Sequence, residues 1–124
     1  MFQDKFPEKY LEGIRLFNEG LYFESHEVWE DLWKEVVGQE KLFYQALIQA
    51  AAALLKFESG IPTGAEMLYN KVLPKLTEIP DHYLGLDVRK FEREFKLFFS
   101  ELWAAPDRST VRFPREKVPK IVLK

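Results

Sequence analysis

The sequence predicts an all-α protein: a compact bundle of about five helices, built from antiparallel helical hairpins, with an extended arm at its C-terminal end. Three observations predict this class. Apolar residues recur at helical spacing along most of the chain, glycines follow several of these periodic stretches, and three of the seven prolines lie beyond residue 105. The 124 residues, 47% of them hydrophobic, suffice for one core that needs no metal or disulfide to fold.

The first two helices are expected to pair as a hairpin. Pro7 can occupy the first turn of a helix at about residues 7–18, and Gly20 is placed to end it. The second helix is expected from about Tyr22 to Val37, with Gly38 as its stop. Because the connection between them is short, the two helices must be antiparallel neighbours.

Three more helices are expected to complete the bundle. The third, at about Glu40 to Phe57, is apolar on nearly all sides, which places it at the centre. The fourth, at about Thr63 to Thr77, is expected to bend or break at Pro74 because proline removes a backbone donor. After a loop, the last helix should run from a capping Asp87 to about Trp103.

A short pattern repeats at an offset of 40 residues. Phe17-x-x-Gly20 matches Phe57-x-x-Gly60, and each glycine is expected in a turn between two helices. The pattern resembles tetratricopeptide-type hairpins, although such arrays usually need about three repeats to be stable alone. Two stacked hairpins are one interpretation, and simple reuse of the same turn chemistry is the other.

The run HEVWE, residues 26–30, resembles the zinc-protease helix motif H-E-x-x-H with glutamate in place of the second histidine. At helical spacing His26, Trp29, Glu30 and Trp33 share one stripe. His26 and Glu30 provide two metal ligands at a suitable pitch, but zinc needs about three protein ligands and no second motif supplies another. A metal-binding protein or hydrolase-like enzyme that uses His26 and Glu30 is therefore the alternative function.

Gln49 is the strongly polar residue within the apolar run LIQAAAALL, residues 47–55, so it must find a partner when the helix is buried. We expect Gln49 to approach His26 and Glu30 at a polar site flanked by Trp29 and Trp33. Such a site is either a structural hydrogen-bond network or a pocket for a small ligand. The sequence identifies no catalytic residue.

The charge is unevenly divided. Residues 104–124 carry six Lys and Arg against two Asp and Glu, so the net charge of −2 leaves the first 103 residues at −6. We expect a bundle domain at residues 1–105 and an extended basic arm at residues 106–124. The arm should dock on its own bundle or, in a homo-oligomer, on a second copy; nucleic acid is disfavoured because the acidic body would repel it.

The cellular location is expected to be the cytoplasm. The chain has no cysteine, which is compatible with a reducing compartment. Its N-terminus lacks the pattern of a signal peptide, and no apolar run approaches the roughly 18 residues that would span a bilayer. A membrane partner is therefore not expected.

Several uncommon residues between about residues 10 and 76 occur in one characteristic order. They are Phe17-Asn18-x-Gly20-x-Tyr22-x-Glu24-x-His26-Glu27-x-Trp29-Glu30-x-x-Trp33, then Leu47-Ile48-Gln49-x-Ala51-Ala52-Ala53, then Gly64-Ala65. This order resembles the small all-helical family catalogued as domain of unknown function 309. Ser25 and Ala46 depart from it, where the family commonly has Ala and Gly. The resemblance implies a helical bundle and a cytosolic prokaryotic protein, and it carries no activity, substrate or catalytic residue.

These observations favour a binding or interaction module with a polar site between helices. A module of this kind needs only shape and an accessible surface, whereas an enzyme would need a solvent-reachable and tuned His26-Glu30 stripe. The expected partner is a small ligand or another protein. No cofactor is expected apart from the divalent metal of the alternative. The expected ligand-binding residues are His26, Trp29, Glu30, Trp33 and Gln49.

Overall fold

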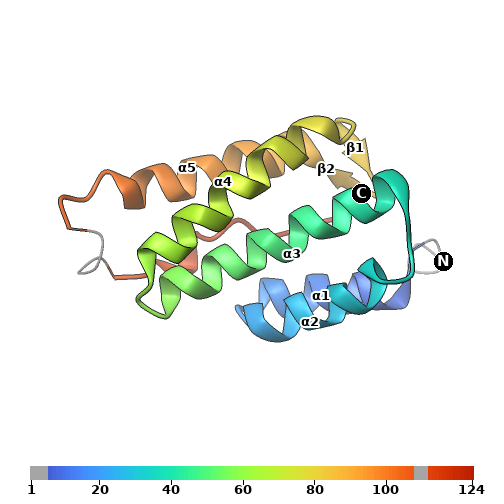
Figure 1. Cartoon of the computed structure of the whole chain (residues 1–124), viewed down its shortest axis with the longest axis horizontal. Helices are drawn as coiled ribbons and strands as arrows, with labels where there is room; N and C mark the ends of the chain where they lie inside the picture. The colour runs from blue at the N-terminus through green and yellow to red at the C-terminus, as the bar shows by residue number, and fades with distance from the viewer. Residues whose placement is uncertain (1–5, 108–111) are drawn as a thin grey trace.

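The computed structural model describes residues 6–107 and 112–124, and within these ranges it confirms the predicted all-α fold (Figure 1). Arg108, one of the six basic residues counted in residues 104–124, lies outside the described residues. The described elements are α1 (Glu8–Asn18), α2 (Tyr22–Trp33), α3 (Gly38–Glu58), α4 (Pro62–Glu78), β1 (His82–Tyr83), β2 (Leu86–Asp87), α5 (Val88–Trp103) and a 3-10 turn (Arg115–Lys117).

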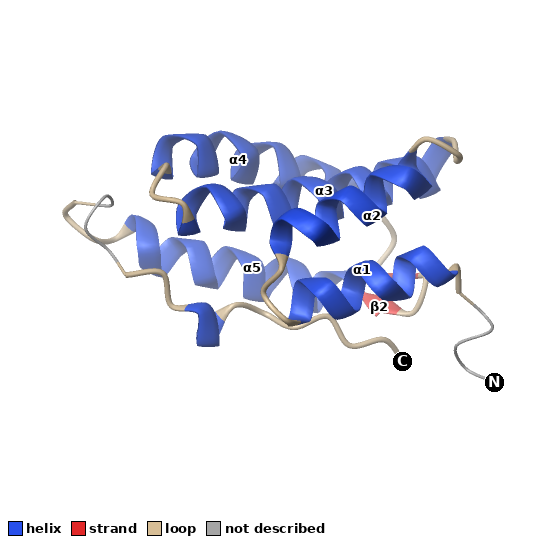
Figure 2. Ribbon diagram, turned by 90° about the horizontal axis from the view of Figure 1, so that it is seen from below, coloured by secondary structure: helices blue, strands red, loops and turns tan. Residues whose placement is uncertain are grey.

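The helices are arranged in two layers. α2, α3 and α4 lie side by side in one layer, and α1 and α5 form the other, with the C-terminal segment running along its outer side (Figure 2). α3 lies between α2 and α4, as its apolar sequence predicts. Its alanines at positions 46, 50 and 53 are fully buried, which allows the neighbouring helices to approach closely.

The two helical hairpins contain the same turn, which explains the 40-residue repeat in the sequence. Gly20 and Gly60 both have φ +82°, a conformation that residues with a side chain rarely adopt. Their amides donate to the carbonyl oxygens of Phe17 and Phe57, at 3.0 Å in both turns. The amides of the next residues, Leu21 and Ile61, donate to the carbonyl oxygens five residues earlier in the chain, at 2.9 Å in both turns. Each turn therefore closes its helix with a Schellman-type pair of hydrogen bonds.

Two predicted helix boundaries are wrong. α2 ends at Trp33 rather than near Val37, and Gly38, predicted to stop α2, begins α3 instead. Val37 is 82% exposed and has extended backbone angles, so no packing extends α2 that far.

Of the two effects predicted for Pro74, the break is absent, and the bend stays a prediction. α4 continues through this residue as one helix from Pro62 to Glu78. Val72 and Leu76, on the neighbouring turns, are both fully buried. We attribute the continuity of α4 to this packing, which offsets the loss of one backbone hydrogen bond.

A small antiparallel strand pair lies where the sequence indicated only a loop. His82 is paired with Asp87, and Tyr83 with Leu86. The second strand leads directly into α5, where the Asp87 carboxylate accepts a hydrogen bond from the backbone N–H of Lys90 at 3.0 Å. The predicted N-cap is therefore confirmed.

The C-terminal arm packs on its own bundle, one of the two predicted positions. Asn18 holds the main chain of Ile121: its Nδ2 donates to the carbonyl oxygen and its Oδ1 accepts from the N–H, both at 2.8 Å. The side chains of Val118 and Ile121 are buried, and the amide of Lys124 donates to the carbonyl oxygen of Gly85 at 2.9 Å. A separate bundle domain at residues 1–105, and a homo-oligomer formed through the arm, stay predictions.

Within the described ranges, no helix combines the length and the apolar character needed to cross a bilayer.

Candidate functional site

Trp29 and Ser25 attach α2 closely to α1. The indole Nε1–H of Trp29 donates to the carbonyl oxygen of Tyr10 at 3.3 Å, and the hydroxyl of Ser25 donates to that of Gly13 at 2.9 Å. A Cβ atom at Gly13 would lie 2.0 Å from Trp29 Nε1, so only glycine permits this approach. Trp29 is fully buried in this contact. It therefore serves the core, and its predicted place at the polar site finds no support in the geometry.

His26 and Glu30 form a pair along the edge of α2. His26 Nε2 lies 2.9 Å from Glu30 Oε1, and His26 Nδ1 lies 3.1 Å from the carbonyl oxygen of Phe23. Both oxygens are acceptors, so a ring that is protonated on both nitrogens can donate to each of them. The Glu30 carboxylate is thus directed along its own helix towards His26.

A recess of about 240 Å³ lies between α2 and α3. Its walls combine an indole, an aliphatic side chain and three polar side chains. The lining residues are Glu30, Trp33, Gln45, Ile48 and Gln49. Three residues predicted from the sequence, Glu30, Trp33 and Gln49, therefore meet at one place, while His26 joins them only through Glu30.

Two polar atoms of this recess are buried without a hydrogen-bond partner: Trp33 Nε1, a donor, and Gln49 Oε1, an acceptor. The expected hydrogen bonds from Gln49 to His26 and Glu30 do not form, because Glu30 pairs with His26 on the same helix instead. Each buried group left unpaired costs about 1–3 kcal/mol of folding free energy. The recess therefore contains one buried donor that lacks an acceptor and one buried acceptor that lacks a donor.

Lys41 covers one face of the Trp33 ring, with its Nζ 4.2 Å from the ring centroid. This cation–π contact favours a fixed orientation of the indole. Sequence reasoning missed Lys41 and Gln45. The signal was present, since Lys41, Gln45 and Gln49 follow each other at four-residue intervals and so share one stripe of α3.

No group of three or more His, Cys, Asp or Glu side chains within residues 6–107 and 112–124 is arranged to hold a metal ion. The second histidine, His82, lies on β1 and faces Asp87, with 4.0 Å between Nε2 and Oδ2. Metal ligation by His26 and Glu30 therefore stays a prediction, and the geometry adds no third ligand to it.

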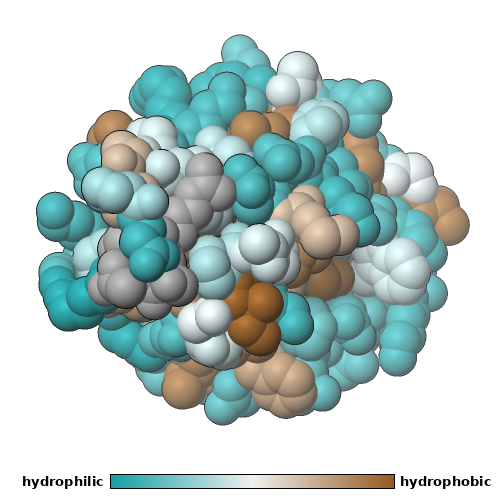
Figure 3. Space-filling model, turned by 60° about the vertical axis from the view of Figure 1, so that its left-hand side comes forward, coloured by the Kyte–Doolittle hydropathy of each residue, from teal (hydrophilic) through white to brown (hydrophobic). Residues whose placement is uncertain are grey.

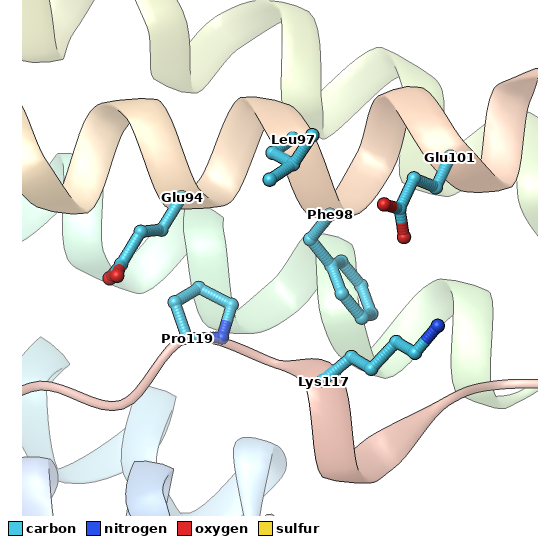
Figure 4. Close-up of a pocket in the computed structure, with 6 residues that line it drawn as sticks. All are labelled: Glu94, Leu97, Phe98, Glu101, Lys117 and Pro119. Carbon is cyan, nitrogen blue, oxygen red and sulfur yellow. The ribbon is translucent and has the colours of Figure 1, made fainter.

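A second hollow, of about 250 Å³, lies between α5 and the arm (Figure 4). It is lined by Glu94, Leu97, Phe98, Glu101, Lys117 and Pro119. None of these side chains has a buried polar atom without a partner, in contrast to the recess between α2 and α3.

On the face shown in Figure 3, apolar side chains form small groups separated by hydrophilic ones.

The comparisons with known proteins agree with the resemblance read from the sequence. Residues 10–68 match the family described as "Domain of unknown function (DUF309)". An "Uncharacterized protein" of Aquifex aeolicus (strain VF5) is 30% identical over 73 residues, which are 58% of this chain and 22% of the relative. The aligned part thus spans about a fifth of that relative. The family match includes both hairpin turns and all five residues that line the recess.

Proposed function

We propose that this chain is a binding module whose ligand site is the recess between α2 and α3. One observation carries the proposal: Trp33 Nε1 and Gln49 Oε1 are buried without partners in side chains that line the same recess. Unpaired buried groups of this kind lower the stability of a fold. A ligand that pairs with both would offset that loss when it binds.

The chemistry of the two atoms selects the class of ligand. The ligand must accept a hydrogen bond from an indole N–H and donate one to an amide oxygen, and an amide group does both. A small carboxamide or a peptide amide meets these demands.

The metal or hydrolase alternative rests on His26 and Glu30 alone. These two side chains pair with each other at 2.9 Å, which uses part of the hydrogen-bonding capacity that a metal or substrate would need. The binding module is therefore the better-supported function. The lack of cysteine also supports a cytoplasmic location, which we include in the proposal.

Titration with N-methylacetamide, followed by the indole ¹H–¹⁵N resonances, tests this proposal. The Trp33 indole resonance should shift saturably. The Trp29 resonance should remain in place, because its N–H already donates to Tyr10. Gln49→Met should abolish the shift. Gln39→Met, a control at the exposed start of α3, should not affect it. An unsaturable shift of the Trp33 resonance, or an equal shift of the Trp29 resonance, would contradict a site in this recess.

A further inference from the structure

The recess between α2 and α3 has two polar walls, one from each helix. Glu30 and Trp33 line it from α2, and Gln45 and Gln49 line it from α3. Glu30 and Trp33 are three residues apart, so they share one face of α2 and lie about 4.5 Å apart along its axis. A ligand in the recess therefore meets a donor and a carboxylate together on the α2 wall, and side-chain amides on the α3 wall.

One oxygen of the Glu30 carboxylate is free for a ligand. Its Oε1 lies 2.9 Å from His26 Nε2, whereas its Oε2 makes no hydrogen bond or ion pair with any described residue. A carboxylate oxygen accepts a stronger hydrogen bond than a neutral oxygen does. The recess thus offers a ligand two unpaired acceptors, Glu30 Oε2 and Gln49 Oε1, and one buried unpaired donor, Trp33 Nε1.

Primary and secondary amides differ in how many of these groups they can pair. A secondary amide, such as a trans peptide bond, is planar and has one N–H, which points away from its oxygen. It can therefore join the Trp33 donor on one wall to the Gln49 acceptor on the other, and it has no donor left for Glu30. Gln45 has both a donor and an acceptor, so it fits either kind of amide and does not select between them.

A primary carboxamide has a second N–H, on the same side as its oxygen. The oxygen and this N–H can face α2 together, where the oxygen accepts from Trp33 Nε1 and the N–H donates to Glu30. The other N–H then points to α3 and donates to Gln49 Oε1. A primary carboxamide thus pairs all three unpaired groups of the recess, and a peptide-bond amide pairs two.

Building on the ligand site proposed above, we propose that the recess selects a primary carboxamide over a peptide-bond amide. The Glu30 carboxylate makes the selection, because the second N–H of the ligand is the group that only a primary amide can give it. A glutamine or asparagine side chain of a partner protein carries this group, and so does a free small-molecule carboxamide.

Propionamide and N-methylacetamide test the selection at equal size, because they are isomers, one a primary and the other a secondary amide. Each is titrated into the full chain and followed by the Trp33 indole resonance. Propionamide should bind about fivefold more tightly. Glu30→Met should abolish this preference, because methionine has a similar length and no acceptor for the second N–H. Glu27→Met, the matched control at an exposed position of α2, should retain it.

Equal affinity of the unaltered chain for the two amides would overturn the selection and leave the proposed function in place. A preference that survives in Glu30→Met would also overturn it, because the selecting group would not be Glu30. The absence of a saturable Trp33 shift with either amide would contradict the proposed function itself, and the selection with it.

Glutamine blocked as N-acetylglutamine methylamide separates the two sources of the group. Binding at least as tight as that of propionamide would support the selection with a protein side chain as the source. Weaker binding of the blocked glutamine, beside the expected preference for propionamide, would support the selection with a free small molecule as the source.

Discussion

Gly13 and Trp29 determine how closely α1 and α2 approach each other. The indole occupies the space that a Cβ at position 13 would need, and it donates to the main chain of the same helix at Tyr10. The absence of a side chain at Gly13 of α1 therefore makes room for the Trp29 indole of α2. Interior packing of this density has no free volume to absorb an added methyl group.

Gly13→Ala is expected to lower the free energy of unfolding by about 1–3 kcal/mol, because the new Cβ would overlap the Trp29 ring. Urea denaturation followed by tryptophan fluorescence measures the change. Gly64→Ala is the control, since its nearest contact would be 3.3 Å to a side-chain carbon of Ile61, a tight approach that a small shift of this exposed side chain relieves. The control should therefore change the free energy of unfolding much less than Gly13→Ala does. Similar losses for the two variants would contradict the close approach at Gly13.

His26→Ala is expected to cost no more than about 0.5 kcal/mol, because His26 is paired with Glu30 on the same, partly exposed helix edge. Chemical denaturation of the variant and the unaltered chain gives this difference. A loss of about 1–3 kcal/mol would instead indicate that His26 belongs to a buried network across helices.

Part of the candidate site could be predicted from the sequence. The spacing of Glu30, Trp33 and Gln49, together with the polarity of Gln49 in an apolar helix, indicated that they would meet. The two tryptophans of the stripe could not be separated in this way. Trp29 turns towards α1 because Gly13 leaves room for it, and Trp33 turns towards α3, where Lys41 covers its ring. Helical spacing alone does not predict which neighbouring helix each tryptophan faces.

The C-terminal arm acts as a packed element of the core. Ile121 is 2% exposed and fixed by Asn18, whereas its neighbour Val122 is 66% exposed. The alternation of apolar and basic residues predicted an extended docked segment. It did not show whether the arm would use its own bundle, because both candidate surfaces belong to the same acidic chain.

Ile121→Ala is expected to lower the free energy of unfolding by about 2–5 kcal/mol, because it removes buried aliphatic volume. Val122→Ala, a change of an exposed neighbour, should leave stability nearly unaltered. Thermal and urea denaturation of both variants provide the comparison. Equal effects would mean that the arm does not pack as described.

The strand pair shows where element prediction from sequence failed. Leu84 and Gly85 form its turn with φ 43° and φ 78°, and leucine rarely adopts a positive φ. The usual two-residue hairpin signals, Asn-Gly or Asp-Gly, are absent here, so local sequence gave only a loop. The helices were predictable because their apolar spacing extends over many residues.

At the scale of the whole molecule, the five tyrosines make the free energy of unfolding depend on pH. Burial raises the pKa of each of them, and for Tyr22 the pKa rises from 10.0 to about 12 despite the opposing effect of nearby Arg115. A phenol whose pKa is higher in the folded state stabilises the fold fully below its unfolded pKa, and this stabilisation is lost as pH rises through the folded pKa. The raised values are those of Tyr10, Tyr22, Tyr44, Tyr69 and Tyr83.

Stability should therefore be insensitive to tyrosine ionisation below pH 10 and should fall between about pH 10 and 12, the interval over which the pKa of Tyr22 is raised. Phenolate absorbance, recorded together with a probe of folding, measures both events. Ionisation should begin late and accompany unfolding. Five tyrosines that ionise near pH 10 in a chain that stays folded would contradict the burial described for them.

The free energy of unfolding of Gln49→Met tests the central claim, that the recess between α2 and α3 keeps unpaired polar groups for a ligand. Methionine has a similar length and needs no hydrogen bond, so the variant should be more stable than the unaltered chain by about 1 kcal/mol or more, while binding of N-methylacetamide is lost. A loss of about 1–3 kcal/mol would contradict the claim, because it would show that the amide of Gln49 is already paired within the fold.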